Sequence, residues 1–243
     1  MISDAPPPYA ALVFDCDSTL SAIEGIDELA LGHKREIAAL TDRAMRGELA
    51  LEEVYEKRLA LVQPSRRDVE EVGALYVRRA LPHAKELVAA ARSLSKRVCI
   101  VSGGLLPAVH VLSRALGFAP GDVFAVGVQF DADGRYSGFD HTSPLARTGG
   151  KIQVVGAIAR AVNGPLCLVG DGATDLEAAG EAARFVAFGG VVRRENVFAR
   201  SRITCETADL AALAPLVFSR DELELLRTKP EHAALLRAAR ISD

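Results

Sequence analysis

Two aspartates separated by one residue follow the first apolar run of the chain. Residues 11–14 are all apolar, and Asp15 and Asp17 come next, together with the hydroxyls of Ser18 and Thr19. An unbroken apolar run predicts a strand buried on both faces, as in a parallel sheet. Ligands of open α/β sheets bind beyond the carboxyl ends of strands, and residues two apart on an extended backbone point the same way. The two carboxylates can therefore converge on one small target.

Converging carboxylates have three interpretations at such a position. One carboxylate can attack phosphorus and form an aspartyl-phosphate while the other gives and takes a proton. The pair can also hold Mg²⁺, a hard cation that takes oxygen ligands. The third interpretation is a polar loop after a core strand, with a cap for the next helix. This segment alone leaves the three open.

The composition excludes several classes of protein. The 243 residues are 49% hydrophobic and 25% charged, which suits one sizeable core with an inserted or appended unit. A formal net charge of −3 predicts no binding to nucleic acid or to an anionic membrane. Neither a transmembrane helix nor a signal peptide is expected. The four cysteines have no zinc-like spacing, so we expect reduced thiols in a cytoplasmic protein.

Alternating strand and helix patterns predict the fold class. Buried strands are expected at 11–14, 98–101, 166–169 and 184–188, and helices at 84–95, 106–116 and about 151–162. This order predicts an α/β protein with a doubly wound, Rossmann-like parallel sheet. Residues 123–130 and 135–139 flank a turn of sequence Asp-Ala-Asp-Gly and predict a β-hairpin.

Residues 21–80 differ from this pattern. Glycine is sparse, apolar residues recur at helical spacing, and no strand signal interrupts them. We expect an inserted helical cap, with helix breaks near Gly32, Gly47 and 63–65. The hydrolase core would then consist of residues 1–20 and 81–243.

The last residues, 218–243, form an extra tail outside this core pattern. Ser219 and Glu222 have the spacing of a capping box before an apolar run, which predicts a helix. A second helix is expected at 231–240. We expect both to pack on the core surface, with a dimer contact as the alternative.

Polar groups follow the later strands as well. Ser102 and Gly103 come after residues 98–101, Asp171 comes after residues 166–169, and Lys151 lies just inside a helix start. Each alone has an ordinary explanation as a turn, a surface lysine or a turn residue. Their joint occurrence at strand and helix ends matches phosphoryl transfer, which needs a nucleophile, a cation and donors to the phosphate oxygens.

That reaction gives each group a role. Asp15 would attack phosphorus, and Asp17 would protonate the leaving alkoxide and later activate water. Mg²⁺ would bridge Asp15, Asp171 and the phosphate. The predicted phosphate-binding groups are Ser102, Gly103 and Lys151.

These segments also carry a resemblance to a known family. Residues 15–19, 102–104, 170–175 and Lys151 resemble the four motifs of the haloacid dehalogenase superfamily, and the chain is similar to its phosphoserine phosphatases. The similarity runs over roughly 10–211, including the helical insert, which corresponds to that family's cap. It implies Mg²⁺-dependent hydrolysis of O-phospho-L-serine through an aspartyl-phosphate, the last step of serine biosynthesis. It also implies that Asp17 contributes to the metal site and that Asp175 contacts the metal ligands without binding the metal ion itself.

The resemblance further implies a substrate pocket. Phosphoserine carries an ammonium and a carboxylate, so a selective pocket should supply one acid and one base. By family position these are Glu24 for the amine and Arg58 for the carboxylate, which without the family would be taken for solvated helix charges. The remaining predicted substrate-binding residues are Met45, Arg46, Gly104 and Thr174. Leu51 departs from the family, which usually has phenylalanine there.

Two other functions stay open at this point. A phosphotransferase would pass the phosphoryl group to an alcohol, and a phosphatase of this superfamily could act on another small phosphorylated alcohol. A catalytically idle binding module is disfavoured because no expected catalytic position is substituted. Haloacid dehalogenation is also disfavoured, because that reaction requires neither Asp17 nor the Mg²⁺ ligands. We expect a small phosphoester substrate and a monomer or homodimer.

Overall fold

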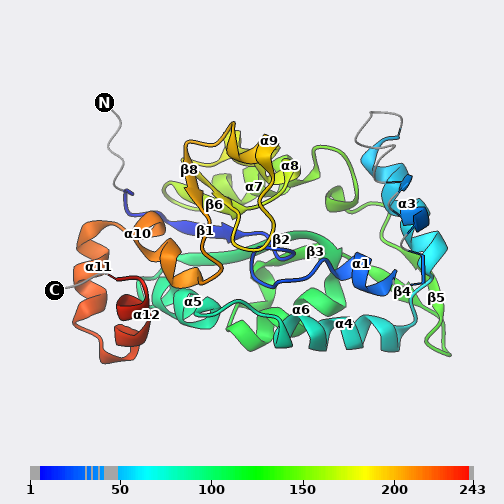
Figure 1. The fold of residues 1–243 in the computed structure, drawn as a ribbon, viewed down its shortest axis with the longest axis horizontal. Coiled ribbons are helices and arrows are strands. Elements are labelled where there is room, and N and C mark those ends of the chain that lie inside the picture. Colours follow the sequence, from blue (N-terminus) through cyan, green and yellow to red (C-terminus); the bar gives the residue numbers. More distant parts are fainter. Residues whose placement is uncertain (1–5, 31, 34, 38, 41–48, 241–243) are drawn as a thin grey trace.

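A six-stranded parallel sheet lies at the centre of the protein. The structure is a computed structural model and describes residues 6–30, 32–33, 35–37, 39–40 and 49–240. The strand order is β3-β2-β1-β6-β7-β8, and every neighbouring pair is parallel (Figure 1). The strands are β1 (Ala11–Phe14), β2 (Arg97–Leu105), β3 (Val123–Val126), β6 (Leu166–Gly170), β7 (Arg184–Phe188) and β8 (Ile203–Cys205). The predicted parallel sheet is confirmed.

Helices cover both faces of the sheet, as in a doubly wound fold. In Figure 1, α5 (Ala84–Ser93) and α6 (Leu106–Leu116) lie on one face, and α7 (Gly150–Ala161) and α8 (Ala173–Ala178) lie on the other. Two short helices, α9 (Glu195–Phe198) and α10 (Ala214–Val217), follow β7 and β8. Brief 3₁₀ segments join these elements: η1 (Pro120–Asp122), η2 (Pro144–Ala146), η3 (Ala179–Glu181) and η4 (Leu210–Leu213).

The register of the central strands brings their carboxyl ends together. Phe14, the last residue of β1, pairs with Ile100 of β2 on one side and Val169 of β6 on the other. All four residues of β1 are fully buried, which explains why the run is apolar on both faces. Asp15 therefore emerges at the same edge as the residues that follow Ile100 and Val169.

The segment 21–80 begins and ends at one place. Ser21 forms an isolated bridge with Ala80, and the amide of Ala22 donates to the carbonyl of Arg79 over 2.9 Å. Its described helices are α1 (Gly25–Leu29), α3 (Leu51–Val62) and α4 (Arg66–Arg78). The predicted break at 63–65 is confirmed, whereas that at Gly47 lies outside the described residues.

Helix α4 packs lengthwise on core helix α6 (Figure 1). Val69, Val72 and Tyr76 on its inner face are buried in the main hydrophobic core. Gly73 permits the close approach, because a Cβ there would lie 2.8 Å from Val111. One helix of the insert thus packs along its length on the core, while α3 lies beside the hairpin strands and adds Tyr55 and Leu59 to the same core.

Two strand predictions need correction. The run 123–130 is not one arm of a hairpin: β3 joins the main sheet, and only β4 (Val128–Phe130) pairs with β5 (Tyr136–Phe139). An apolar run suits both kinds of strand, so Gly127 is a weak local signal of the division and does not indicate that the two halves join different sheets. Strand β2 also continues through Ser102 to Leu105, beyond the predicted end.

The C-terminal tail packs on the core, as predicted. Helix α11 (Arg220–Arg227) starts at the predicted capping box of Ser219 and Glu222. After η5 (Pro230–His232), α12 (Ala233–Ala238) buries Leu235 and Leu236. The ammonium of Lys96 is buried between the Glu222 carboxylate and the Tyr9 carbonyl, which it donates to over 2.7 Å.

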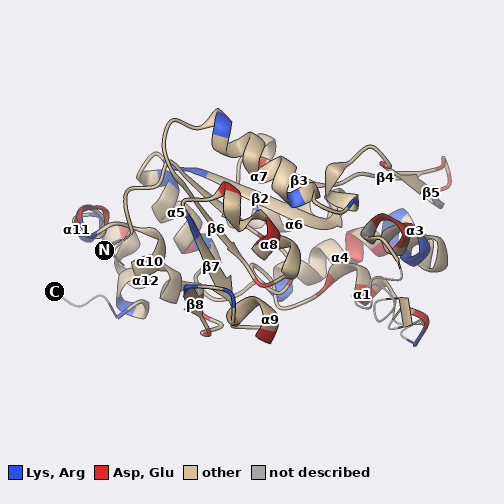
Figure 2. Ribbon diagram, turned by 90° about the horizontal axis from the view of Figure 1, so that it is seen from above, with Lys and Arg blue, Asp and Glu red and all other residues tan. Residues whose placement is uncertain are grey.

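Charge is mixed over the surface of the described chain. Figure 2 shows basic and acidic residues side by side on α3 and α11 instead of a basic face. Among the described helices, none combines the length and the apolar character needed to cross a membrane.

Candidate active site

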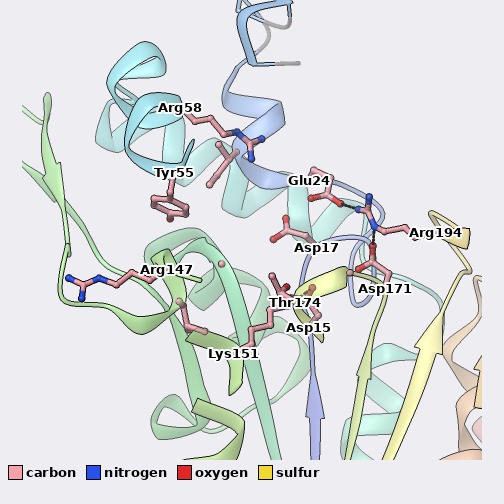
Figure 3. Close-up of a pocket in the computed structure, with 14 residues that line it drawn as sticks. Asp15, Asp17, Glu24, Tyr55, Arg58, Arg147, Lys151, Asp171, Thr174 and Arg194 are labelled. Atoms are coloured by element: carbon pink, nitrogen blue, oxygen red, sulfur yellow. Dashed lines mark hydrogen bonds and ion pairs between the residues drawn. The ribbon is translucent and has the colours of Figure 1, made fainter. Parts of the chain in front are cut away.

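A pocket of about 210 Å³ opens where β1 and β6 end (Figure 3). Its floor comes from the sheet and α7, and the facing wall comes from α3 and the start of α1. The lining residues are Asp15, Asp17, Glu24, Ile26, Tyr55, Arg58, Gly103, Leu145, Arg147, Lys151, Asp171, Gly172, Thr174 and Arg194. The sequence analysis named eight of these fourteen as site residues, namely Asp15, Asp17, Glu24, Arg58, Gly103, Lys151, Asp171 and Thr174.

Lys151 joins two carboxylates beneath the pocket. Its Nζ lies 2.8 Å from Asp15 Oδ2 and 2.7 Å from Asp175 Oδ1, and all three residues are buried. Burial alone lowers the pKa of Lys151, but the negative charges of Asp15 and Asp175 outweigh it and raise that pKa, so the ammonium stays charged at neutral pH. Burial raises the pKa of Asp175, and the ammonium opposes that rise.

The position of Lys151 depends on a glycine. A Cβ at Gly150 would lie 1.7 Å from the carbonyl oxygen of Pro144, so no other residue fits against η2. This contact fixes the first turn of α7 beside the sheet. The ammonium is thereby held at the end of β1.

Asp17 has a different set of partners. Its Oδ1 accepts from the Tyr76 hydroxyl over 2.6 Å and from the Gly25 amide over 2.7 Å, and its Oδ2 accepts from the Ser102 hydroxyl over 3.3 Å. Burial, followed by the nearby charge of Asp15, raises the pKa of Asp17 to about 6, against the opposing hydrogen bonds. A carboxyl group with that pKa can both donate and accept a proton near neutral pH.

Asp171 and Glu24 are bridged by an arginine that the sequence analysis missed. Arg194 Nε donates to Asp171 Oδ2 over 2.9 Å, and its Nη2 donates to Glu24 Oε1 over 3.1 Å. The Thr19 hydroxyl completes the set with a 3.2 Å bond to Asp171 Oδ1. Burial, then the charge of Asp17, raises the pKa of Glu24 to about 7.

Three buried carboxylates are close enough to share a cation. One oxygen each from Asp15, Asp171 and Asp175 lie within 4.8 Å of one another. Oxygen donors of this kind suit a hard divalent metal ion. Asp15 and Asp171 line the pocket, whereas Asp175 lies behind it and accepts from Lys151 and from the Gly172 amide. The group can therefore hold a metal ion on its pocket side.

Asp17 is not part of that carboxylate group. Its oxygens face Tyr76, Gly25 and Ser102. Its predicted contribution to the metal site stays a prediction. Its side chain is arranged as that of a proton donor and acceptor would be.

The predicted phosphate-binding groups lie around the same floor. Gly103 lines the pocket beside Lys151, and Ser102 is fully buried next to it. The Ser102 hydroxyl accepts from the Gly104 amide over 2.9 Å, which orients it toward Asp17. Gly104 itself does not line the pocket.

The predicted substrate residues are described only in part. Glu24, Arg58 and Thr174 line the pocket, and the guanidinium of Arg58 pairs with Asp27. Met45 and Arg46 lie outside the described residues, as does the side chain of Leu51.

The missed lining residues left weak signals. Arg194 follows β7 as a polar residue after a strand, and Tyr55 lies one helical turn before Arg58 on α3. The others are Ile26, Leu145, Gly172 and Arg147, of which the first two are apolar and carry no chemical signal.

Comparisons with known proteins bear on this arrangement. A profile of the haloacid dehalogenase-like hydrolases matches residues 12–180. The chain belongs to this family. The match spans β1 to α8 and so includes Asp15, Asp17, Lys151 and Asp171.

Relatives within the family point to one branch of it. The chain is 38% identical over 190 residues to the phosphoserine phosphatase of Rattus norvegicus, covering 77% of this chain and 84% of the relative. It is also 38% identical over 196 residues to the chloroplastic phosphoserine phosphatase of Arabidopsis thaliana, covering 79% and 66%. Among solved structures of the family, a phospho-aspartyl intermediate analogue of phosphoserine phosphatase superposes with a TM-score of 0.69 at 26% identity, covering 87% of this chain and all of the other.

Proposed function

We propose that this protein is a Mg²⁺-dependent phosphoserine phosphatase that forms a covalent intermediate on Asp15. The observation that carries the proposal is the joint placement of Asp15, Asp17 and Lys151 at the end of the central strand. The identity to curated phosphoserine phosphatases over most of the chain supports the substrate. The reaction would complete serine biosynthesis.

The first half of the reaction transfers the phosphoryl group to the enzyme. A carboxylate oxygen of Asp15 forms a bond to phosphorus as the bond to the serine oxygen breaks, and Asp17 gives its proton to the leaving alkoxide. Lys151 holds Asp15 in place through their ion pair of 2.8 Å. The Ser102 hydroxyl, the Gly103 amide and the Lys151 ammonium stabilise the negative charge on the phosphate oxygens.

The second half releases inorganic phosphate. Asp17, now ionised, takes a proton from water, whose oxygen attacks phosphorus and frees Asp15. Asp15 and Asp171 would hold a metal ion, whose charge would offset that of the phosphoryl group. We propose Mg²⁺ for this place because the available ligands are oxygens.

Glu24 and Arg58 supply the selectivity in this proposal. The substrate ammonium would pair with Glu24, and its carboxylate with Arg58, whose planar guanidinium offers a fork of donors. Both side chains line the pocket on the side away from the sheet. Residues 21–80 would act as the cap that carries these two groups and excludes water when it closes.

The cellular compartment, the type of substrate and the oligomeric state complete the proposal. The four cysteines are free and buried, which fits a reducing compartment such as the cytoplasm. A small charged phosphoester is the expected partner. We expect the protein to act as a monomer or a homodimer.

A substrate panel tests the function. Phosphate release is measured with L-phosphoserine, D-phosphoserine, phosphothreonine, phosphoethanolamine and glycerol phosphate, each with Mg²⁺ and with EDTA. We expect strong preference for phosphoserine, lost in EDTA. Equal rates over the panel would contradict the selective pocket, and transfer to added alcohols in excess of phosphate release would identify a phosphotransferase.

A further inference from the structure

The hydroxyl of Tyr55 faces the pocket without a hydrogen-bond partner among the described residues. The side chain of Tyr55 is buried, with 6% of its surface exposed, and its hydroxyl makes no hydrogen bond to any described residue. Leaving a buried hydroxyl without a hydrogen-bond partner destabilises the folded protein. A ligand that occupies the pocket and accepts a hydrogen bond from this hydroxyl would explain its position.

The tyrosine ring is held in position. It contacts the ring of Phe139 on β5, with centroids 5.2 Å apart and planes tilted by 58°. Figure 3 shows the side chain reaching from α3 toward the cavity, on the wall that faces Asp15 and Lys151. Burial raises the pKa of Tyr55, so its hydroxyl remains a hydrogen-bond donor at every physiological pH.

A second unpartnered donor lies one helical turn away. Arg58 is three residues after Tyr55 on α3, a spacing that puts both on one helix face, and both line the pocket. Arg58 Nε is buried and has no hydrogen-bond partner among the described residues, although another nitrogen of the group pairs with Asp27. Two neighbouring donors without acceptors indicate that the missing ligand presents acceptor oxygens here.

We propose that Tyr55 is a specificity-determining residue whose hydroxyl, together with Arg58, donates to the carboxylate of the substrate. This inference rests on the proposed phosphoserine phosphatase activity. The phosphate is the other oxygen-rich group of that substrate. Of its proposed donors, Gly103 and Lys151 line the floor of the pocket and Ser102 is buried next to them. The carboxylate is therefore the group left for Tyr55.

The test compares two substrates in the Tyr55→Phe variant. L-phosphoserine and phosphoethanolamine share the phosphate and the amine, but only the first has a carboxylate. We expect the KM for L-phosphoserine to rise about tenfold or more, since hydrogen bonds to charged groups are strong, while kcat changes little. The constant for phosphoethanolamine, measured as KM or as its inhibition constant against L-phosphoserine, should not change.

Thermal unfolding separates this role from a structural one. Removing a hydroxyl that has no partner among the described residues should leave the unfolding midpoint of Tyr55→Phe unchanged or raise it. Tyr9 offers a matched control, because its hydroxyl is also buried and unpartnered among the described residues but lies outside the pocket. Tyr9→Phe should alter neither KM nor kcat.

Different results would overturn the proposed role of Tyr55 and the proposed phosphatase function. An unchanged KM for L-phosphoserine, equal losses with both substrates, or a lowered unfolding midpoint in Tyr55→Phe would each overturn the inference alone. A wild-type protein that does not hydrolyse L-phosphoserine would overturn the proposed function and the inference with it.

Discussion

The hydroxyl of Tyr76 lies 2.6 Å from Oδ1 of Asp17, so a helix of the 21–80 segment orients the proposed acid–base group. Tyr76 is fully buried at the end of α4 that approaches the sheet. The Gly25 amide, 2.7 Å from the same oxygen, comes from the start of α1. The position of the proposed acid–base group is therefore determined jointly by the loop after β1, which carries Asp17, and by the segment inserted after it.

Loss of the Tyr76 hydroxyl should impair catalysis more than binding. In Tyr76→Phe, Asp17 loses one of its three donors and is free to turn away from the leaving oxygen. We expect kcat for L-phosphoserine to fall about tenfold, a fraction of what a positioned acid–base group contributes. Steady-state kinetics measure this, and a fall in kcat/KM that comes wholly from KM would contradict the role.

Asp15→Asn should abolish turnover while the fold survives. The amide keeps the shape of the carboxylate but cannot attack phosphorus, so we expect a loss of more than about a thousandfold in kcat. Phosphate release and the circular-dichroism spectrum are measured on the same sample. A folded variant with appreciable activity would exclude Asp15 as the nucleophile.

Lys151→Met should lower both activity and stability. The variant leaves the buried carboxylates of Asp15 and Asp175 without their shared cation, which costs about 3–5 kcal/mol of unfolding free energy in comparable buried pairs. Urea denaturation measures the change. Lys85→Met, at an exposed position on α5, is the control and should stay within about 0.5 kcal/mol of the wild type.

Divalent cations should stabilise the folded protein through Asp171. A ligand that binds only the folded state adds about 2.7 kcal/mol at a concentration one hundred times its Kd. We expect Mg²⁺ to raise the thermal midpoint of the wild type, EDTA to reverse the rise, and Asp171→Asn to remove most of it. An equal rise in the variant would mean that the ion binds elsewhere.

His232 should make the protein less stable in mild acid. Its Nε2 lies 2.9 Å from Ser93 Oγ under the tail, and burial lowers its pKa below the value of about 6.5 expected in an unfolded chain. As the pH falls through that value, the unfolded chain binds a proton before the folded one does, so stability drops. Denaturation at pH 7.5 and 5.5 should show a smaller drop for His232→Gln than for the wild type.

The sequence was sufficient to predict the position of site residues that come directly after strands. Asp15 and Asp171 come after buried apolar runs, and the parallel register places such strand ends at one edge. Lys151 was found because glycines mark the start of its helix. In each case the chemistry and the element that positions it are adjacent in the chain.

The missed residues depend on contacts across the fold. Arg194 reaches the site because β7 lies next to β6, and Tyr55 because α3 packs against β5. The division of 123–130 between two sheets likewise depends on a distant segment, because β3 joins the main sheet by pairing with β2. Local patterns carry only weak signals of these contacts, because the contacts form when segments distant in the sequence meet.

The buried ammonium of Lys96 links a residue just before β1 to the C-terminal part of the described chain. It holds the carbonyl of Tyr9, just ahead of β1, and is neutralised by Glu222 in α11. A substitution at Glu222 would leave the charge of Lys96 unpaired next to the start of β1, the strand that Asp15 follows. A genetic screen for lost activity would then recover changes in the tail beside those in the pocket, and their effects should be reversed by lower growth temperature, whereas those of pocket variants should not.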